Sequence, residues 1–285
     1  ITKISSKRAY LLLNLQIIRS VKDLESVLQQ YEEINFVPTM GNLHAGHLSL
    51  VSEANKYDGI TLVSIFINPL QFAPNEDLDI YPRTEKQDLK ELEKINCDVV
   101  FCPEPNFAEG AKQLHANADL SKKLCGISRP HFFHGVISIL NHFFQLIKPK
   151  NVFFGLKDYQ QYLIVKDFLT QSTLKTSIHG IPIVREPDGL AMSSRNNLLT
   201  PDQRLIASKL SVILKDTAQQ AKIKNLEHLR VEGIKKLEEL NFTVDYFSFC
   251  NSSTLEEIDD FEENTLLAIA VNLGGVRLID NYLIQ

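Results

Sequence analysis

The sequence predicts an α/β fold in which a doubly wound parallel sheet is followed by a smaller α+β domain. Two observations carry this prediction. From about Gln16, short apolar runs alternate with helical segments, which is the rhythm of repeated βαβ units with right-handed crossovers. One of these runs, 60–67 (Ile-Thr-Leu-Val-Ser-Ile-Phe-Ile), is rich in β-branched residues throughout, as is typical of a strand buried on both faces of a parallel sheet.

The predicted elements of the large sheet follow one another at regular intervals. We expect strands at 35–38, 60–67, 98–102, 151–154 and 177–184, and helices at 46–56, 137–146 and 158–169. Thr84 and Gln87 predict a capping box at the start of one further helix. Because ligands of such sheets bind beyond the carboxyl ends of the strands, we expect the side chains that follow 35–38, 60–67 and 151–154 to meet in one crevice.

The character of the chain changes near Arg185. A loop that contains Gly and Ser leads to Thr200, the predicted N-cap of a long helix with Pro201 at its first position. Charged helical sequence follows at 226–240, and strands are expected near 244–249 and 266–272. We therefore expect two domains, a Rossmann-like ligand-binding domain at 16–184 and an α+β lid domain at 185–285.

Residues 1–15 stand apart from both predicted domains. Lys and Arg precede the apolar run at 9–13, as in a signal peptide, but Asn14 and Gln16 interrupt that run and no small-residue cleavage site follows. Since the sequence does not begin with Met, we expect a cloning remnant or an extended start here.

Composition narrows the classes of function. The chain has 285 residues, of which 44% are hydrophobic and 23% charged, and its net charge of −5 provides no basic surface for nucleic acid. No stretch approaches the roughly 20 apolar residues of a membrane span. The four cysteines match no zinc or redox spacing, which predicts reduced thiols and a cytoplasmic protein: Cys97, Cys102, Cys125 and Cys250.

The segment 36–50 is the most informative part of the sequence. An apolar strand ends, the chain turns through Met40 and Gly41, and His44 and His47 follow at a helix start. Residues three apart share a helical face, and a helix N-terminus favours anions, so the two imidazoles predict a site for a nucleotide triphosphate. Gly46 leaves room for a base or ribose to approach the backbone. The sequence His-Ala-Gly-His resembles the His-x-Gly-His signature of the nucleotidylyl transferases.

Three further segments carry polar groups at strand ends or between the domains. At 155–161 (Gly-Leu-Lys-Asp-Tyr-Gln-Gln), Lys157 supplies a mobile cation for phosphates and Asp158 an acceptor for a ribose hydroxyl. At 68–71 (Asn-Pro-Leu-Gln), neutral amides suit a small polar substrate. At 189–196, two serines and an arginine on an interdomain loop are the components of a phosphate clamp that closes over bound nucleotide.

Five motifs in order resemble the pantothenate synthetase family, also called pantoate:beta-alanine ligase. They lie at 38–47, 64–72, 81–84, 153–161 and 188–196, and the resemblance runs from about Gln16 to the end of the chain, including 277–281 (Arg-Leu-Ile-Asp-Asn). It implies a Rossmann-like fold of the His-x-Gly-His nucleotidylyl transferase type. It also implies that ATP and pantoate form pantoyl adenylate and pyrophosphate, with Mg2+ on the phosphates, and that beta-alanine then releases AMP and pantothenate.

The resemblance implies roles for particular residues by motif position. The triphosphate is expected to contact the catalytic residues His44, His47 and Lys157 and the clamp Ser193, Ser194 and Arg195. The nucleoside is expected to be framed by Met40, Gly155, Asp158, Val184 and Met192, and pantoate to be held by Gln71, Gln161 and Asn68. No side chain is implied as a nucleophile or assigned as a metal ligand. The family also implies a homodimer.

The sequence departs from the family's pattern at three places. Leu156 replaces a usual Glu, Cys125 replaces the Glu of a Leu-Glu-Gly segment, and 129–133 reads Arg-Pro-His-Phe-Phe instead of Arg-Pro-Gly-His-Phe, with His134 following. Two alternatives stay open, the first because it shares His44 and His47 and the second because acidic residues are lost at Leu156 and Cys125. One is another nucleotidylyl transferase, such as a coenzyme or nicotinamide adenylyltransferase, which would have no use for the amides at 68–71 and 160–161. The other is a nucleotide-binding homologue without turnover.

Overall fold

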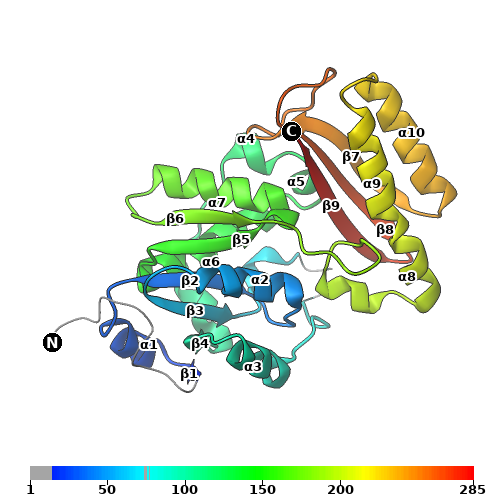
Figure 1. The fold of residues 1–285 in the computed structure, drawn as a ribbon. Coiled ribbons are helices and arrows are strands. Elements are labelled where there is room, and N and C mark those ends of the chain that lie inside the picture. The colour runs from blue at the N-terminus through cyan, green and yellow to red at the C-terminus, as the bar shows by residue number, and fades with distance from the viewer. Residues whose placement is uncertain (1–14, 74–75, 77) are drawn as a thin grey trace.

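The computed structural model describes residues 15–73, 76 and 78–285. The expectation for residues 1–15 therefore lies outside the described residues, apart from Leu15. Strands and helices alternate from β1 to β6, and a second group of helices and strands follows (Figure 1). Among the described helices, none has the length and apolar composition needed to cross a membrane.

The large sheet has six strands in the order β1-β4-β3-β2-β5-β6, and every pairing within it is parallel. The strands are β1 (Gln16–Ile18), β2 (Ile34–Thr39), β3 (Ile60–Ile65), β4 (Val99–Phe101), β5 (Asn151–Gly155) and β6 (Ser177–Ile181). From β2 the chain builds the sheet toward one edge through β3 and later turns back to the other edge through β5 and β6. The crevice of such a sheet lies where the strand order reverses, so β2 and β5 mark the expected ligand site.

Helices cover both faces of this sheet, as the doubly wound prediction requires (Figure 1). The principal helices are α1 (Val21–Leu28), α2 (Ala45–Ala54), α3 (Glu85–Lys94), α6 (Phe132–Ile147) and α7 (Tyr159–Gln171), with short α4 (Ala118–Ser121) and α5 (Cys125–Ser128) before α6. Adjacent residues of β2 show the two faces: Phe36 packs in a core with α1, α6 and α7, and Val37 packs in a core with α2 and α3. This alternation of side chains buries both faces of the strand.

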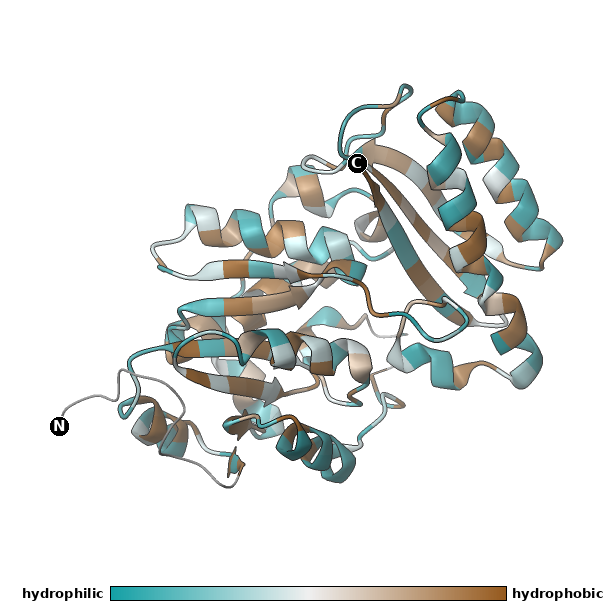
Figure 2. Ribbon diagram, in the orientation of Figure 1, coloured by the Kyte–Doolittle hydropathy of each residue, from teal (hydrophilic) through white to brown (hydrophobic). Residues whose placement is uncertain are grey.

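The C-terminal region is a small α+β domain around an antiparallel sheet. Its elements are α8 (Pro201–Ala207), α9 (Lys209–Gln220), α10 (Leu226–Glu239), β7 (Thr243–Asn251), β8 (Thr265–Leu273) and β9 (Val276–Ile284). Along β8, Leu267 and Ile269 pack in a core with α9 and α10, whereas Leu266 and Ala268 pack toward the large sheet. Figure 2 shows the resulting hydrophobic strands, with hydrophilic residues on the helices.

Several local predictions need correction. Thr84 is the N-cap of α3 but forms no capping box, because its hydroxyl donates to the Asp88 carboxylate instead of accepting from the backbone. The long helix expected from Thr200 is divided at Ser208 into α8 and α9. Helix α6 begins five residues before the predicted Ile137, and the strand expected at 177–184 ends at Ile181. Strand β9 was not expected at all.

In the described part of the chain, four short 3-10 helices lie between the longer elements. They are η1 (Pro69–Gln71), η2 (Pro105–Gly110), η3 (Leu156–Asp158) and η4 (Ser194–Leu198). Three of them, η1, η3 and η4, contribute polar residues to a cavity at the carboxyl ends of the strands. Helix α6 approaches η1 so closely that a Cβ atom at Gly135 would lie 2.0 Å from the Leu70 carbonyl oxygen. The position of η1 therefore depends on a residue without a side chain in α6.

We predict that Gly135→Ala destabilises the protein, although alanine favours a helix interior by about 1 kcal/mol. The added methyl group must displace the Leu70 backbone, and such overpacking costs about 1–3 kcal/mol. Urea unfolding should report a lower free energy of unfolding. Gly155→Ala is the control, since a Cβ atom there meets nothing within 4 Å. Equal stability of Gly135→Ala and the wild type would contradict the close packing of α6 on η1.

Candidate active site

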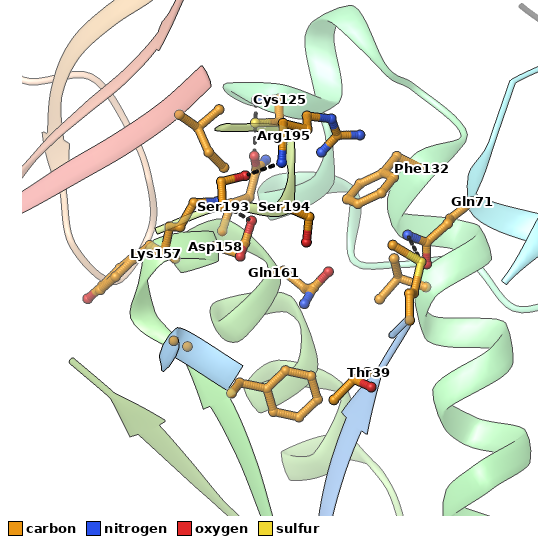
Figure 3. A pocket seen from close by; sticks show the side chains of 18 of the residues that line it. Thr39, Gln71, Cys125, Phe132, Lys157, Asp158, Gln161, Ser193, Ser194 and Arg195 are labelled. Atoms are coloured by element: carbon orange, nitrogen blue, oxygen red, sulfur yellow. Dashed lines mark hydrogen bonds and ion pairs between the residues drawn. The ribbon is translucent and has the colours of Figure 1, made fainter. Parts of the chain in front are cut away.

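One cavity of about 680 Å³ lies at the carboxyl ends of the parallel strands, and β9 contributes to its wall. Its lining includes all residues that the resemblance assigns to ATP or pantoate: Met40, His44, His47, Asn68, Gln71, Gly155, Lys157, Asp158, Gln161, Val184, Met192, Ser193, Ser194 and Arg195. In Figure 3, Gln161 lies between the side chains of Ser194 and Asp158 on one side and Gln71 on the other. Lys157 and Ser193 lie on the same side as Asp158 (Figure 3), so we call this the phosphate side and the side of Gln71 the amide side.

The two histidines cap helix α2 reciprocally. His44 is the N-cap residue, and its Nδ1 accepts a hydrogen bond of 3.1 Å from the Gly46 backbone N–H. His47 lies one turn further on, and its Nδ1 accepts a bond of 3.3 Å from the His44 backbone N–H. Because each Nδ1 is an acceptor, each neutral ring carries its proton on Nε2. The helix N-terminus thus presents two imidazole N–H donors beside its own backbone donors.

Both histidine rings are held in the neutral form. Burial lowers the pKa of His44 to about 4, with the Lys157 charge adding to the effect. Burial also lowers the pKa of His47 to about 3, and His44 and Lys157 reinforce the shift. The ring centroids are 4.1 Å apart, so a second positive charge in this pair would be strongly opposed. At neutral pH the site offers hydrogen-bond donors without imidazolium charge.

Gly46 is needed for this cap. A Cβ atom at this position would lie 2.8 Å from His44 Cε1 and 2.9 Å from His44 Nδ1. Any other residue would push the His44 ring away from the Gly46 N–H that it accepts from. The sequence suggested that Gly46 admits the ligand, and the structure adds this separate reason for its small size.

Lys157 faces the histidines from η3, directly after β5. Its Nζ lies 3.6 Å from Asp158 Oδ1, and its side chain is mostly buried. The Asn281 side chain, from β9, donates to the backbone carbonyls of both Leu156 and Lys157. The cation of the site is therefore supported by a strand more than 100 residues away in sequence.

The segment 193–195 closes the same side of the cavity. Ser193 is the N-cap of η4 and accepts from the Arg195 N–H. Ser194 Oγ donates to the Asn42 carbonyl, 3.3 Å away, in the turn that precedes α2. Behind it, the Met192 N–H donates to the Val184 carbonyl. The loop predicted as a clamp therefore already contacts the histidine turn in this structure.

The amide side of the cavity is built around Gln71. Its Nε2 donates to Met40 Sδ over 3.3 Å, and its Oε1 accepts from Asn68 Nδ2 over 3.1 Å. Asn68 is only 2% exposed, and its amide also donates to the Gly135 carbonyl and accepts from the Leu70 N–H. Asn68 therefore holds the Gln71 amide in one orientation, with the Nε2 donors on the side of Met40.

The two adjacent glutamines of α7 have different surroundings. Both line the cavity, where Figure 3 shows the Gln161 side chain. Gln160 is buried, and its amide donates to the carbonyls of Leu120 and Lys123 and accepts from the Cys125 N–H. Gln160 thus attaches the segment before α6 to α7, which is a structural role that the sequence did not distinguish from that of its neighbour.

Sequence reasoning missed Asp88. This residue of α3 is 2% exposed, and its carboxylate accepts from the backbone N–H groups of Asn42 and Leu43, at 2.9 and 2.8 Å. Asp88 therefore fixes the turn that leads into the histidine cap. The available signal was an acidic residue four positions after Thr84 and four before the buried Leu92, on the same side of α3.

The departures from the family's pattern lie around the cavity. The Leu156 side chain packs beside Gly180 of β6, and its backbone carbonyl accepts a hydrogen bond from the Asn281 side chain. Cys125 Sγ lies 3.2 Å from the Tyr246 hydroxyl and 3.6 Å from the Arg277 guanidinium. His134 Nδ1 accepts from the Ala116 N–H, which ties α6 to the preceding loop. Leu156, Cys125 and His134 therefore each have a defined contact in the structure.

A parallel sheet with paired histidines at a helix start, a lysine opposite them and amides beyond them defines a nucleotide-binding α/β enzyme. The family model described as pantoate-beta-alanine ligase matches residues 16–283. The chain belongs to this family and is an ATP-dependent ligase. That membership separates it from other transferases with the His-x-Gly-His signature.

Individual relatives agree with the family assignment. A pantothenate synthetase of Acinetobacter baumannii is 42% identical over 252 residues, which cover 87% of this chain and 89% of the relative. The crystal structure of pantothenate synthetase from Thermus thermophilus matches with a TM-score of 0.90 at 34% identity, over 94% of this chain and 99% of that one. A pantoate-beta-alanine ligase from Francisella tularensis, described as a complex with beta-gamma ATP and beta-alanine, matches with a TM-score of 0.80 at 32% identity, over 95% and 98%.

We predict that His44 and His47 stay neutral, with the proton on Nε2, from pH 7.5 down to pH 5. Their lowered pKa values of about 4 and about 3 place protonation below that range. Nitrogen-15 NMR of the imidazoles measures both tautomer and charge. The urea-unfolded protein is the reference, since its histidines should titrate near the ordinary pKa of about 6.5. A protonation midpoint near pH 6.5 for either ring in the folded protein would contradict the cap.

Proposed function

We propose that the protein condenses pantoate with beta-alanine through a pantoyl adenylate. A carboxylate oxygen of pantoate attacks the α-phosphorus of ATP and pyrophosphate leaves; the amine of beta-alanine then attacks the acyl carbon and AMP leaves. The observation that carries this proposal is the placement of two neutral imidazole donors and one lysine on one side of a cavity whose other side presents oriented amides. No side chain acts as a nucleophile.

The phosphate side accounts for activation of ATP. We assign the triphosphate to the Nε2–H groups of His44 and His47, to Lys157 and to the loop 193–195. The nucleoside contacts the remaining ATP residues of the cavity, Met40, Gly155, Asp158, Val184 and Met192. Donors that are already oriented stabilise charge as it develops on the phosphates, and they need no reorganisation during the reaction.

Mg2+ enters this scheme as part of the MgATP substrate. Among the described residues, no three His, Cys, Asp or Glu side chains come together as a metal site. The nearby acidic groups have other partners: Asp158 lies beside Lys157, and Asp88 accepts from the backbone. Mg2+ commonly keeps several waters and binds through substrate phosphates, which suits this arrangement.

The amide side accounts for selection of pantoate. We assign the acid to Gln71 and Gln161, which reach the cavity, and place Asn68 behind Gln71 as the residue that orients it. Residues 16–184 then form the domain that binds nucleotide and pantoate, and residues 185–285 form the lid. We further propose that the enzyme works in the cytoplasm as a homodimer, as its family implies.

We predict pyrophosphate–ATP exchange that requires pantoate and Mg2+ but not beta-alanine, because the first step needs no amine. His44→Ala, His47→Ala and Lys157→Ala should each slow this exchange on the order of a hundredfold, the usual cost of one oriented donor. The assay follows labelled pyrophosphate into ATP. His228→Ala, an exposed position in α10, is the control. Exchange that appears only with beta-alanine would refute the adenylate route, and unchanged rates in all three variants would refute the residue assignment.

Gln71→Ala and Gln161→Ala should raise the KM for pantoate more than the KM for ATP. Each removes amide hydrogen bonds to a small acid, worth about 1 kcal/mol net, or roughly fivefold in affinity. Steady-state kinetics with each substrate varied in turn measures the difference. Gln145→Ala, an exposed glutamine in α6, provides the matched control. Equal changes in both KM values would remove the assignment of the glutamines to pantoate.

A further inference from the structure

Strand β9 contacts the phosphate side of the cavity through the amide group of Asn281. The Nδ2 atom donates two hydrogen bonds of 2.9 Å, one to the Leu156 carbonyl and one to the Lys157 carbonyl. These carbonyls belong to η3, the single turn that carries Lys157 between β5 and α7. Asn281 thus fixes the backbone from which the Lys157 side chain extends.

Local sequence does little to fix this turn. Gly155 precedes η3 and has no side chain to cap it, and Asp158 makes no capping bond at the start of α7. Short 3-10 turns have poorer hydrogen-bond geometry than α-helices and are often set by their surroundings. The two bonds from Asn281 supply the missing support from outside the segment.

Asn281 is itself held rigidly. It is buried, and its position in β9 is opposite the buried Ala268 of β8. Its backbone N–H donates to the carboxylate of Asp280 over 2.8 Å. A buried amide with this many partners has one orientation, because rotating it would leave its donors unpaired.

The neighbouring residue holds the other arm of the phosphate site. Asp280, whose side chain is fully buried, accepts bonds of 2.7 and 3.0 Å from the Arg185 guanidinium. Arg185 also donates to the Gly189 carbonyl, and the segment 184–192 that it stabilises leads directly into Ser193. Adjacent residues of one strand therefore support both Lys157 and the loop 193–195.

We propose that Asn281 is a positioning residue for adenylate formation, which acts by holding the η3 backbone so that Lys157 meets the phosphates opposite His44 and His47. Together with Asp280, it makes β9 the common support of the two arms of the phosphate site. An asparagine is required because one amide nitrogen provides two donors, whereas an aspartate of the same shape places negative charge against two carbonyl oxygens. The inference rests on the role of Lys157 in the proposed function.

The test is a double-mutant cycle on pyrophosphate–ATP exchange. Asn281→Asp should slow the pantoate-dependent exchange on the order of a hundredfold, since displacement of a positioned group by about 1 Å has that effect. The KM for pantoate should change little, because Gln71 and Gln161 are untouched. In a Lys157→Ala background the same substitution should cost much less, because the group that it misplaces is already absent.

Two further variants keep the test decisive. Asn281→Ala removes both bonds without adding charge, and it carries the same comparison if Asn281→Asp does not fold. Asn272→Asp is the matched control in β8, because its Oδ1 accepts from the Gly275 N–H and an aspartate retains that acceptor. The control should exchange at the wild-type rate.

The outcomes separate the inference from the proposed function. The inference is supported if the wild type exchanges and Asn281→Asp greatly lowers the exchange rate, but lowers it little in the Lys157→Ala background. The inference is overturned if the wild type exchanges and the rate loss of the double variant equals the product of the two single losses. It is also overturned if neither Asn281 variant exchanges more slowly than the wild type. In both cases the proposed function stands. Absence of pantoate-dependent exchange in the wild type overturns the proposed function, and the inference with it.

Discussion

The reciprocal cap between His44 and His47 is the interaction on which the rest of the site depends. Ordinary capping residues satisfy the first backbone donors of a helix with side-chain oxygens, and here two imidazole nitrogens do so. This use of Nδ1 determines where the ring protons lie. Capping the N-terminus of helix α2 thereby orients two imidazole Nε2–H donors at the helix end that already favours anions.

The surroundings of the cap preserve that arrangement. Gly46 leaves space for the His44 ring, and Asp88 holds the backbone of the turn from the opposite side. Burial removes the charge from both rings, so in the proposed function the triphosphate meets neutral N–H groups and Lys157 rather than imidazolium. Neutral donors also avoid the cost of placing further positive charges beside Lys157.

The sequence predicted the parallel sheet and a set of polar and charged residues that line the cavity, because strand periodicity and strand-end motifs are local signals. It predicted poorly where tertiary contacts override local ones. Thr84 is the N-cap of α3 as expected, but the predicted capping box is absent because its hydroxyl donates to the buried Asp88 carboxylate. Strand β9 escaped detection because it interrupts its apolar pattern with Arg277, Asp280 and Asn281, and the last two of these support segments distant in sequence. Gln160 and Gln161 look equivalent in sequence, and only the tertiary structure shows that the Gln160 amide is buried and bonded to the segment before α6.

In the proposed reaction, the cavity aligns a carboxylate oxygen of pantoate with the α-phosphorus of ATP above the paired histidines. This alignment can be tested by turnover of pantoate labelled with oxygen-18 in its carboxylate, with the products analysed by mass spectrometry or phosphorus-31 NMR. We expect one oxygen-18 atom in the phosphate of AMP and none in pyrophosphate. Unlabelled AMP formed together with pantothenate would contradict attack of the carboxylate on the α-phosphorus.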